Sequence, residues 1–265
     1  MMSLVQRPDE SGEPDTALHG PGEDARPSHR SESCETQEPK PRSGDFLVAK
    51  NLSARGPEGE IFSGLTFSAA RGEIVLIAGD KASGRTSALL TLAGRFRHTG
   101  GYLTIDGHGD PAELRRLSTI AAASPVVEIE PYLTVAQLVT ETALVGAVKE
   151  RDVWRMCQTL SVRADSGDTY VRLPALEQNI LALALAAAQR TPVIVIDNVD
   201  ADTDAAGMTR QWAAMRQLSE LGRLLVVTAL RADRTADQIV RLTREKLAAA
   251  ARVAAPIGVM GRDDQ

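Results

Sequence analysis

The stretch Glu73–Leu90 constrains the fold of this chain more than any other part of the sequence. Residues 74–78 form a short apolar run bounded by charge and glycine, as expected for a buried strand. Gly79 and Gly84 flank the loop that follows, and a helical pattern starts at Thr86. A strand, a glycine-flanked loop and a helix N-terminus together direct backbone N–H groups toward a bound phosphate. The stretch therefore predicts a phosphate-binding loop.

The loop is a near match to the pattern G-x-x-x-x-G-K-[ST], in which Lys contacts the β- and γ-phosphates and Ser or Thr contacts the metal. Arg85 replaces the Lys, and the hydroxyl position is intact as Thr86. Arg keeps the charge, but its planar guanidinium does not substitute for a compact ammonium. An ordinary strand–turn–helix joint is the alternative. The expected nucleotide-binding residues are Gly79, Asp80, Lys81, Ala82, Ser83, Gly84, Arg85, Thr86 and Ser87.

The composition is typical of one globular domain, alone or with a tail, in 265 residues. The sequence has no apolar run of about 18 residues, so it predicts no transmembrane helix. Its polar, acidic start predicts no secretory signal peptide. Cys34 and Cys157 are the only cysteines. Two isolated cysteines predict neither a disulfide framework nor a metal site, and favour a reducing cytosol.

The acidic charge is concentrated at the N-terminus. Residues 1–45 hold 5 Lys and Arg against 10 Asp and Glu, a net charge of −5, and the remaining 25 against 25 cancel. Residues 1–45 are also rich in Pro, Gly and Ser and poor in large apolar groups, which predicts a disordered acidic leader. The sequence has no basic stretch of the kind that binds nucleic acid, so we expect no nucleic-acid partner.

Short apolar runs alternate with helical patterns over residues 46–265. Strands are expected at residues 46–49, 61–67, 74–78, 101–106, 120–123, 193–197, 224–228 and, as an edge strand, 237–242. Helices are expected at 87–96, 111–117, 134–146, 149–160, 175–188, 208–221 and 245–252. The pattern predicts an α/β fold with a mostly parallel sheet covered by helices on both faces. The first two strands are expected to pair as an antiparallel hairpin.

The order of motifs from Phe46 to Leu242 resembles the nucleotide-binding domains of ATP-binding-cassette (ABC) proteins. The motifs that carry the resemblance are the hairpin segments Asn51-Leu52-Ser53 and Gly72-Glu73-Ile74, the strand and turn Gly101 to Gly107, Leu133-Thr134-Val135, the segment Leu173 to Gln178, and Pro192 with Val193 to Asp197. The resemblance implies a P-loop NTPase-like fold over residues 46–265, with a small helical subdomain at about 126–175.

Several positions that act on the nucleotide in this family are altered here. Asp197 keeps the metal-side acid, but Asn198 replaces the catalytic Glu, and an amide cannot act as a general base. Ala229 stands at the switch histidine and Pro125 at the Gln of the preceding loop. The signature Ser-Gly-Gly is replaced by Pro174, Ala175 and Leu176, and Ala82 stands where the family has another Gly. No aromatic residue lies near Arg55 and Gly56 to stack on adenine, and Asp204 matches the aspartate after the acidic motif.

The resemblance implies weak binding of ATP and Mg²⁺, with Thr86 and Asp197 on the metal side. We expect a cassette-like subunit with little or no ATP hydrolysis, held at the inner face of the cell membrane by a membrane-spanning partner. The alternatives are an active ATPase that drives transport and an unrelated phosphate-loop protein. The chain could form a homodimer, or a heterodimer in which an intact cassette supplies the signature. The sequence does not identify the transported substrate or the direction of transport.

Overall fold

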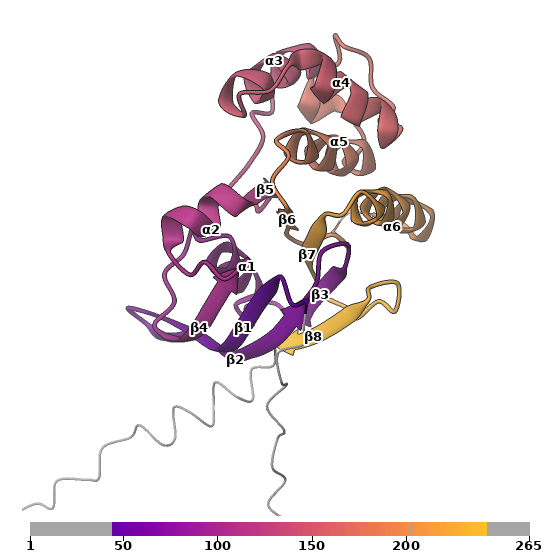
Figure 1. Cartoon of the computed structure of the whole chain (residues 1–265). Coiled ribbons are helices and arrows are strands. Elements are labelled where there is room, and N and C mark those ends of the chain that lie inside the picture. The colour runs from indigo at the N-terminus through magenta and orange to yellow at the C-terminus, as the bar shows by residue number, and fades with distance from the viewer. Residues whose placement is uncertain (1–43, 202, 243–265) are drawn as a thin grey trace, which may run out of the picture. The chain divides into compact units, whose positions relative to one another are not determined.

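The computed structural model describes residues 44–201 and 203–242, all within one compact unit, Pro39–Gln265. Its strands are β1 (Leu47–Gly56), β2 (Gly59–Ala69), β3 (Ile74–Gly79), β4 (Gly100–Ile105), β5 (Ser118–Ala122), β6 (Val193–Ile196), β7 (Leu224–Ala229) and β8 (Gln238–Leu242). Its helices are α1 (Arg85–Leu92), α2 (Pro111–Leu117), α3 (Val135–Val145), α4 (Glu150–Thr159), α5 (Ala175–Ala188), α6 (Ala205–Glu220) and the short 3₁₀ helix η1 (Tyr170–Arg172) (Figure 1). Most of the expected leader and the expected helix 245–252 lie outside the described residues.

A five-stranded sheet carries the phosphate loop. Its strand order is β5-β6-β7-β3-β8, and every neighbouring pair is parallel. β3 lies between β7 and β8, with Ile74 opposite Leu225 and Val75 opposite Gln238. The parallel sheet is confirmed, and so is the edge strand at the end of the described chain. Its strands are nearly continuous apolar runs, because both faces of the sheet are buried.

The N-terminal strands form a second sheet with the order β2-β1-β4 and antiparallel pairing. The hairpin is confirmed, but the expected strand lengths are wrong. The first strand was expected at residues 46–49, with residues 51–53 ending it, whereas β1 continues to Gly56 through shifts in register. The shift is possible because Asn51 takes a positive φ of 48°, and its N–H donates to Oγ1 of Thr66 at 2.9 Å. A bulge of this kind leaves no simple alternation in the sequence.

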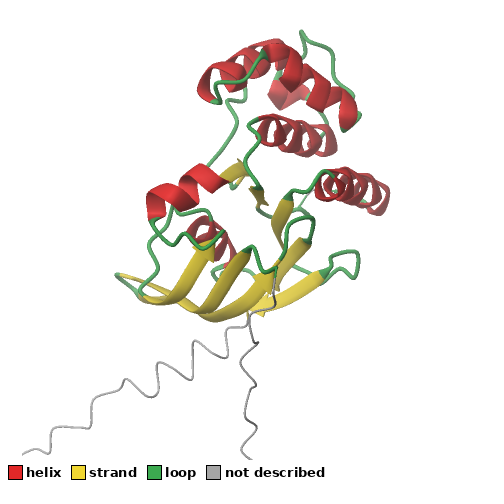
Figure 2. Cartoon of the chain, viewed as in Figure 1, coloured by secondary structure: helices red, strands yellow, loops and turns green. Residues whose placement is uncertain are grey.

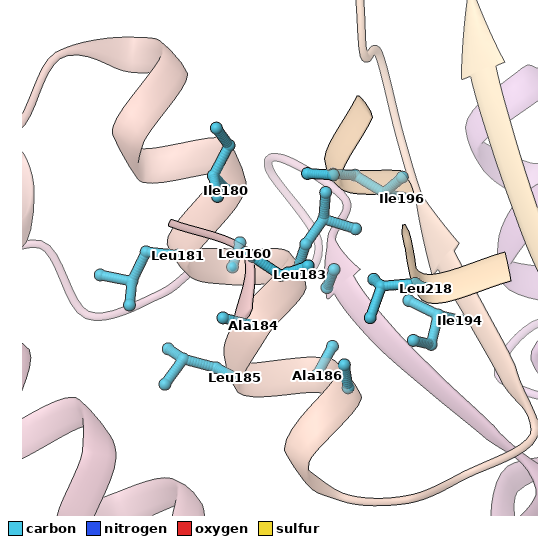
Figure 3. Close-up of a cluster of buried hydrophobic side chains, with 14 of the residues drawn as sticks. Leu160, Ile180, Leu181, Leu183, Ala184, Leu185, Ala186, Ile194, Ile196 and Leu218 are labelled. Atoms are coloured by element: carbon cyan, nitrogen blue, oxygen red, sulfur yellow. The ribbon is translucent and has the colours of Figure 1, made fainter. Parts of the chain in front are cut away.

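Alternate residues of the parallel strands enter two different cores. Ile74 and Leu76 of β3 pack in the core that contains residues of α3 to α6, whereas Val75 and Ile77 pack with α1, α2 and the antiparallel sheet. Figure 3 shows side chains of α5 gathered with Ile194 of β6 and other members of the first core. Both faces of the parallel sheet are therefore covered, as expected.

Two helix boundaries differ from expectation. Helix α1 ends at Leu92 rather than residue 96, because Gly94 has a φ of +69° and lies against α2, where a Cβ would be 2.7 Å from Cβ of Leu114. Helix α6 begins at Ala205 rather than residue 208, because the side chain of Asp204 accepts from the N–H of Gly207 at 2.7 Å. A side-chain oxygen at this position satisfies one of the free N–H groups of the first turn.

Residues 126–175 contain α3, α4 and η1, and α4 packs on α5. Figure 2 shows α3, α4 and α5 grouped at the end away from the antiparallel sheet. Thr134 caps α3 as expected, in a capping box with Gln137. Within the described part of the chain, no helix combines the length and the apolar character needed to cross a membrane.

Candidate functional site

Two glycines shape the phosphate loop, residues 79–87, between β3 and α1. A Cβ at Gly79 would lie 2.5 Å from the carbonyl oxygen of Leu242 and 2.6 Å from Oγ of Ser83. Gly84 has a φ of +86°, and a Cβ there would lie 2.4 Å from the carbonyl oxygen of Ile61. Both positions therefore require glycine, because backbone atoms occupy the space of a side chain. The strand and helix expected on either side are confirmed.

The loop holds two polar side-chain atoms without partners. Oγ of Ser83 and Nη1 of Arg85 are buried and have no hydrogen-bond partner among the described residues. Arg85 is only 8% exposed. Buried polar groups are nearly always paired, so two orphans in one loop indicate that a ligand completes their bonding. Phosphate oxygens fit this role, since they accept hydrogen bonds and carry the charge that guanidinium binds.

The remaining loop residues differ in exposure. Asp80, Lys81 and Ala82 are exposed, whereas Thr86 and Ser87 are half-buried at the start of α1. Ala82 takes a φ of 60°, a left-handed conformation that costs a residue with a Cβ about 1 kcal/mol. A cavity of about 530 Å³ opens beside the loop, lined by residues 82–87 together with Glu60 and Ile61. Its volume is within the range of small-molecule sites.

Asp197 follows β6 and is joined to the phosphate loop. Its Oδ2 accepts from Oγ1 of Thr86 at 2.5 Å and from Nδ2 of Asn198 at 3.2 Å, and its Oδ1 accepts from Oγ1 of Thr228. Asp197 is 8% exposed. The two residues expected on the metal side, Thr86 and Asp197, are therefore in contact, although 111 positions separate them in sequence.

The pair of oxygen ligands is compatible with Mg²⁺ bound together with phosphate. Mg²⁺ in nucleotide sites takes one or two protein oxygens and completes its shell with water and phosphate oxygens. Among the described residues, no group of three or more His, Cys, Asp and Glu side chains is placed to hold a metal without such help. Thr86 and Asp197 would hold the ion, which would neutralise phosphate charge.

The side chains next to Asp197 are not placed for acid–base chemistry. Asn198 takes a φ of 50°, its N–H donates to Oγ1 of Thr228 at 2.8 Å, and its side-chain amide donates to Asp197. Ala229 is the last residue of β7, opposite Ala78, and is 3% exposed. Asn198 and Ala229 thus lie near the loop as expected, and neither side chain can accept a proton from water.

The segment expected to replace the signature caps α5. Pro174 is the N-cap residue of this helix, and neither Pro174 nor the side chains of Ala175 and Leu176 can offer a hydroxyl or a glycine backbone to a phosphate. Glu177, the next residue, is buried. Its carboxylate accepts from both terminal nitrogens of Arg210 and, at 2.8 Å, from the N–H of Arg163. Glu177 therefore joins α5 to α6 through its ion pair with Arg210.

A second cavity, of about 510 Å³, lies between Asn198 and the segment around Pro125. Ser124 donates to the carboxylate of Glu128 at 2.5 Å across the turn that contains Pro125. Tyr170 also lines this cavity, and burial, with the charge of Glu128, raises the pKa of its phenol to about 12. Residues 124–128, Ser-Pro-Val-Val-Glu, contain no side-chain amide.

Sequence reasoning missed three groups in and around the site. Thr228 was expected only as the end of a strand, yet it fixes both Asp197 and Asn198. Glu60 was not singled out, although it lines the cavity beside the loop. The ion pair of Glu177 with Arg210 joins residues 33 positions apart, which no local pattern reports. A hydroxyl near the carboxyl end of an otherwise apolar buried strand is the one signal that would have identified Thr228.

Several known proteins are similar to this chain. It is 24% identical over 209 residues to the ribose import ATP-binding protein RbsA 1 of Rubrobacter xylanophilus, a match that covers 75% of this chain and 42% of that protein. It is 29% identical over 167 residues to the cytochrome c biogenesis ATP-binding export protein CcmA of Bradyrhizobium diazoefficiens, covering 63% of this chain and 82% of the relative. The chain thus spans less than half the length of the first relative and most of the second.

Solved structures share the fold. The structure of cbiO1 from Clostridium perfringens, part of the ABC transporter complex cbiONQ, superimposes with a TM-score of 0.67 at 16% identity, over 79% of this chain and 93% of that one. The ADP conformation of MJ1267, an ATP-binding cassette of an ABC transporter, gives 0.64 at 15% identity, over 75% and 87%. The sequence model of ABC transporters matches residues 62–201, more than half of the chain. With this match and the phosphate loop beside Asp197, the chain belongs to the ABC transporter family and carries its ATP-binding cassette.

Proposed function

We propose that this cassette is the nucleotide-binding subunit of a membrane transport complex, and that it binds nucleoside triphosphate with little or no hydrolysis. The observation that carries the proposal is the pair of unpartnered atoms, Oγ of Ser83 and Nη1 of Arg85, in a loop whose glycines are sterically required. These groups favour an anion at the N-terminus of α1. ATP with Mg²⁺ is the family's ligand, and Thr86 and Asp197 would hold the ion.

Weak binding of ATP is supported by three features of the site. Arg85 replaces the compact ammonium that usually contacts the terminal phosphates. Ala82 holds a left-handed conformation that a glycine would adopt without strain. The sequence places no aromatic residue next to Arg55 and Gly56 to stack on the base, a contact worth about 1–3 kcal/mol in nucleic-acid sites.

Weak hydrolysis is supported by the groups around Asp197. Phosphoryl transfer depends almost wholly on positioning and charge stabilisation. Asn198 cannot act as the base, Ala229 has no polar side-chain group to contact the γ-phosphate, and Pro174 begins a segment without the signature's hydroxyl and glycines. The contact between Thr86 and Asp197 favours a second candidate, an active ATPase that couples hydrolysis to transport.

A membrane-spanning partner is supported by an apolar surface on α3. Leu144 and Val145 are both 77% exposed, and they edge a groove of about 450 Å³ that also includes Leu133 and Ala136. Glu141 lines this groove and the adjoining cavity. We therefore propose as occupant an amphipathic segment of the partner with apolar and basic side chains, which would hold the subunit at the inner face of the membrane. A second cassette, identical or intact, would complete the nucleotide site across a dimer.

The test is calorimetric titration of the full chain with ATP and with inorganic tripolyphosphate, each with and without Mg²⁺. We expect dissociation constants above about 1 μM, and at least a tenfold loss in Arg85→Met. Arg97→Met is the matched control, because Arg97 is exposed beyond the end of α1. A wild-type chain that binds neither ligand would overturn the proposal. Mg²⁺-dependent release of phosphate that Asp197→Ala abolishes would favour the active ATPase.

A further inference from the structure

The cavity beside the phosphate loop has a second charged wall. Residues 82–87 form one wall of the cavity, and Glu60 and Ile61, at the start of β2, form the other wall. The backbone of Ile61 is close to the loop, since its carbonyl oxygen lies 2.4 Å from the position of a Cβ on Gly84. Glu60 is the next residue toward the turn between β1 and β2. Glu60 therefore lines the same cavity as residues 82–87.

The carboxylate of Glu60 is incompletely bonded. Its side chain is 13% exposed, and Oε2 lies 4.0 Å from Nη2 of Arg55. The other oxygen, Oε1, is buried and has no hydrogen-bond partner among the described residues. A buried carboxylate oxygen without a hydrogen bond costs free energy, so a ligand N–H that donates to this oxygen would stabilise the complex. The cavity thus offers an acceptor at Glu60 and a cation at Arg85.

A ligand that matches both walls carries phosphate at one end and adjacent N–H donors at the other. Guanine presents N1–H and the C2 amino group side by side, and a carboxylate can accept from both. Adenine presents its amino group beside the lone pair of N1, which a carboxylate repels. We propose that the cavity binds guanine nucleotides in preference to adenine nucleotides, with the carboxylate of Glu60 accepting from the N1–H and amino group of guanine. This inference rests on the proposed function, since it needs the loop to bind a nucleotide.

The experiment compares the affinities of the full chain for GTP, ITP, XTP and ATP, each with Mg²⁺, by calorimetry. Each correct base-edge pairing typically changes affinity about tenfold. We expect GTP to bind at least about tenfold more tightly than ATP, with ITP between them because hypoxanthine lacks the amino group. The variant Glu60→Gln should lose the preference for GTP and gain affinity for XTP, because a carboxamide accepts from N1–H and donates to the C2 carbonyl of xanthine. Glu58→Gln, at an exposed acid of the same turn, is the control and should behave as wild type.

Tripolyphosphate, which has no base, separates this inference from the proposed function. Equal binding of GTP and ATP, or a preference for GTP that Glu60→Gln leaves unchanged, would overturn the inference while the loop still binds phosphate. A uniform gain in affinity for every ligand in Glu60→Gln, tripolyphosphate included, would also overturn it, because Glu60 would then act only by repelling anions. Failure of tripolyphosphate and all four nucleotides to bind would overturn both.

Discussion

Replacing Arg210 should destabilise the fold far more than its position on α6 indicates. Its two terminal nitrogens donate to the carboxylate of Glu177, and one of them donates to the carbonyl oxygen of Ser161 at 2.6 Å. The side chain of Glu177 is 7% exposed. In Arg210→Met this carboxylate would keep only the N–H of Arg163, so a buried charge would remain without its counter-ion. Such a loss costs about 3–5 kcal/mol.

The assay is chemical unfolding in urea, with a double-mutant cycle. Arg210→Met should lose about 3–5 kcal/mol, and adding Glu177→Met should recover at least about 2 kcal/mol, because the double variant buries no unpaired charge. Arg216→Met is the matched control on the same helix. Its pair with Asp237 is about one-third exposed on each side, so its loss should cost under about 1 kcal/mol. Equal losses in Arg210→Met and Arg216→Met, or no recovery in the double variant, would refute the reasoning.

Four further predictions concern the site and the chain ends. The wild-type chain and Asn198→Glu should both show no significant phosphate release, because catalytic groups act together and restoring one of several missing groups does not restore hydrolysis. Robust turnover in either protein would contradict this prediction. Gly79→Ala should weaken tripolyphosphate binding at least about tenfold, since its Cβ would meet the carbonyl oxygen of Leu242, and unchanged calorimetric affinity would disprove it. Burial raises the pKa of the Cys157 thiol to about 11 and the pKa of the Tyr170 phenol to about 12. The contribution of these two groups to the free energy of unfolding should therefore be complete below about pH 9 and be lost as the pH rises toward 12. In Tyr170→Phe the free energy of unfolding should fall less steeply over this pH range. Deleting residues 1–45 should shift the melting temperature by under about 2 °C, and a larger fall would show that this segment packs on the domain.

The elements that sequence predicted well are those set by short-range physics. The apolar runs of β3, β6 and β7 are buried on both faces. A short apolar run without alternating polar residues is typical of a central strand in a parallel sheet, so these strands could be predicted. The loop was found because Gly79 and Gly84 are needed for local backbone reasons. Motif order alone singled out Asn198 and Ala229, and the structure places both beside the loop, whereas their loss of a catalytic role stays a prediction.

The features that sequence did not predict depend on contacts between distant residues. The end of α1 follows from the approach of Gly94 to Leu114, which only the packing of α2 produces. The bulge in β1 depends on the hydrogen bond between Asn51 and Thr66 across the hairpin. Glu60 reads as an ordinary charged residue near a turn, and its role as a wall of the cavity comes from the passage of β2 beside the loop.

The strand order of the parallel sheet has a consequence for how this protein is made. β3 pairs with β7 and β8, and Ile74 finds its partner Leu225 only 151 positions later in the chain. At a synthesis rate of about 5–20 residues per second, the ribosome needs roughly 8–30 s to provide that partner. During this time one of the most apolar strands of the protein has no neighbour on either edge. Pairing between such distant segments is slow, so we expect nascent chains of this protein to depend on chaperones that shield β3 until β7 and β8 emerge.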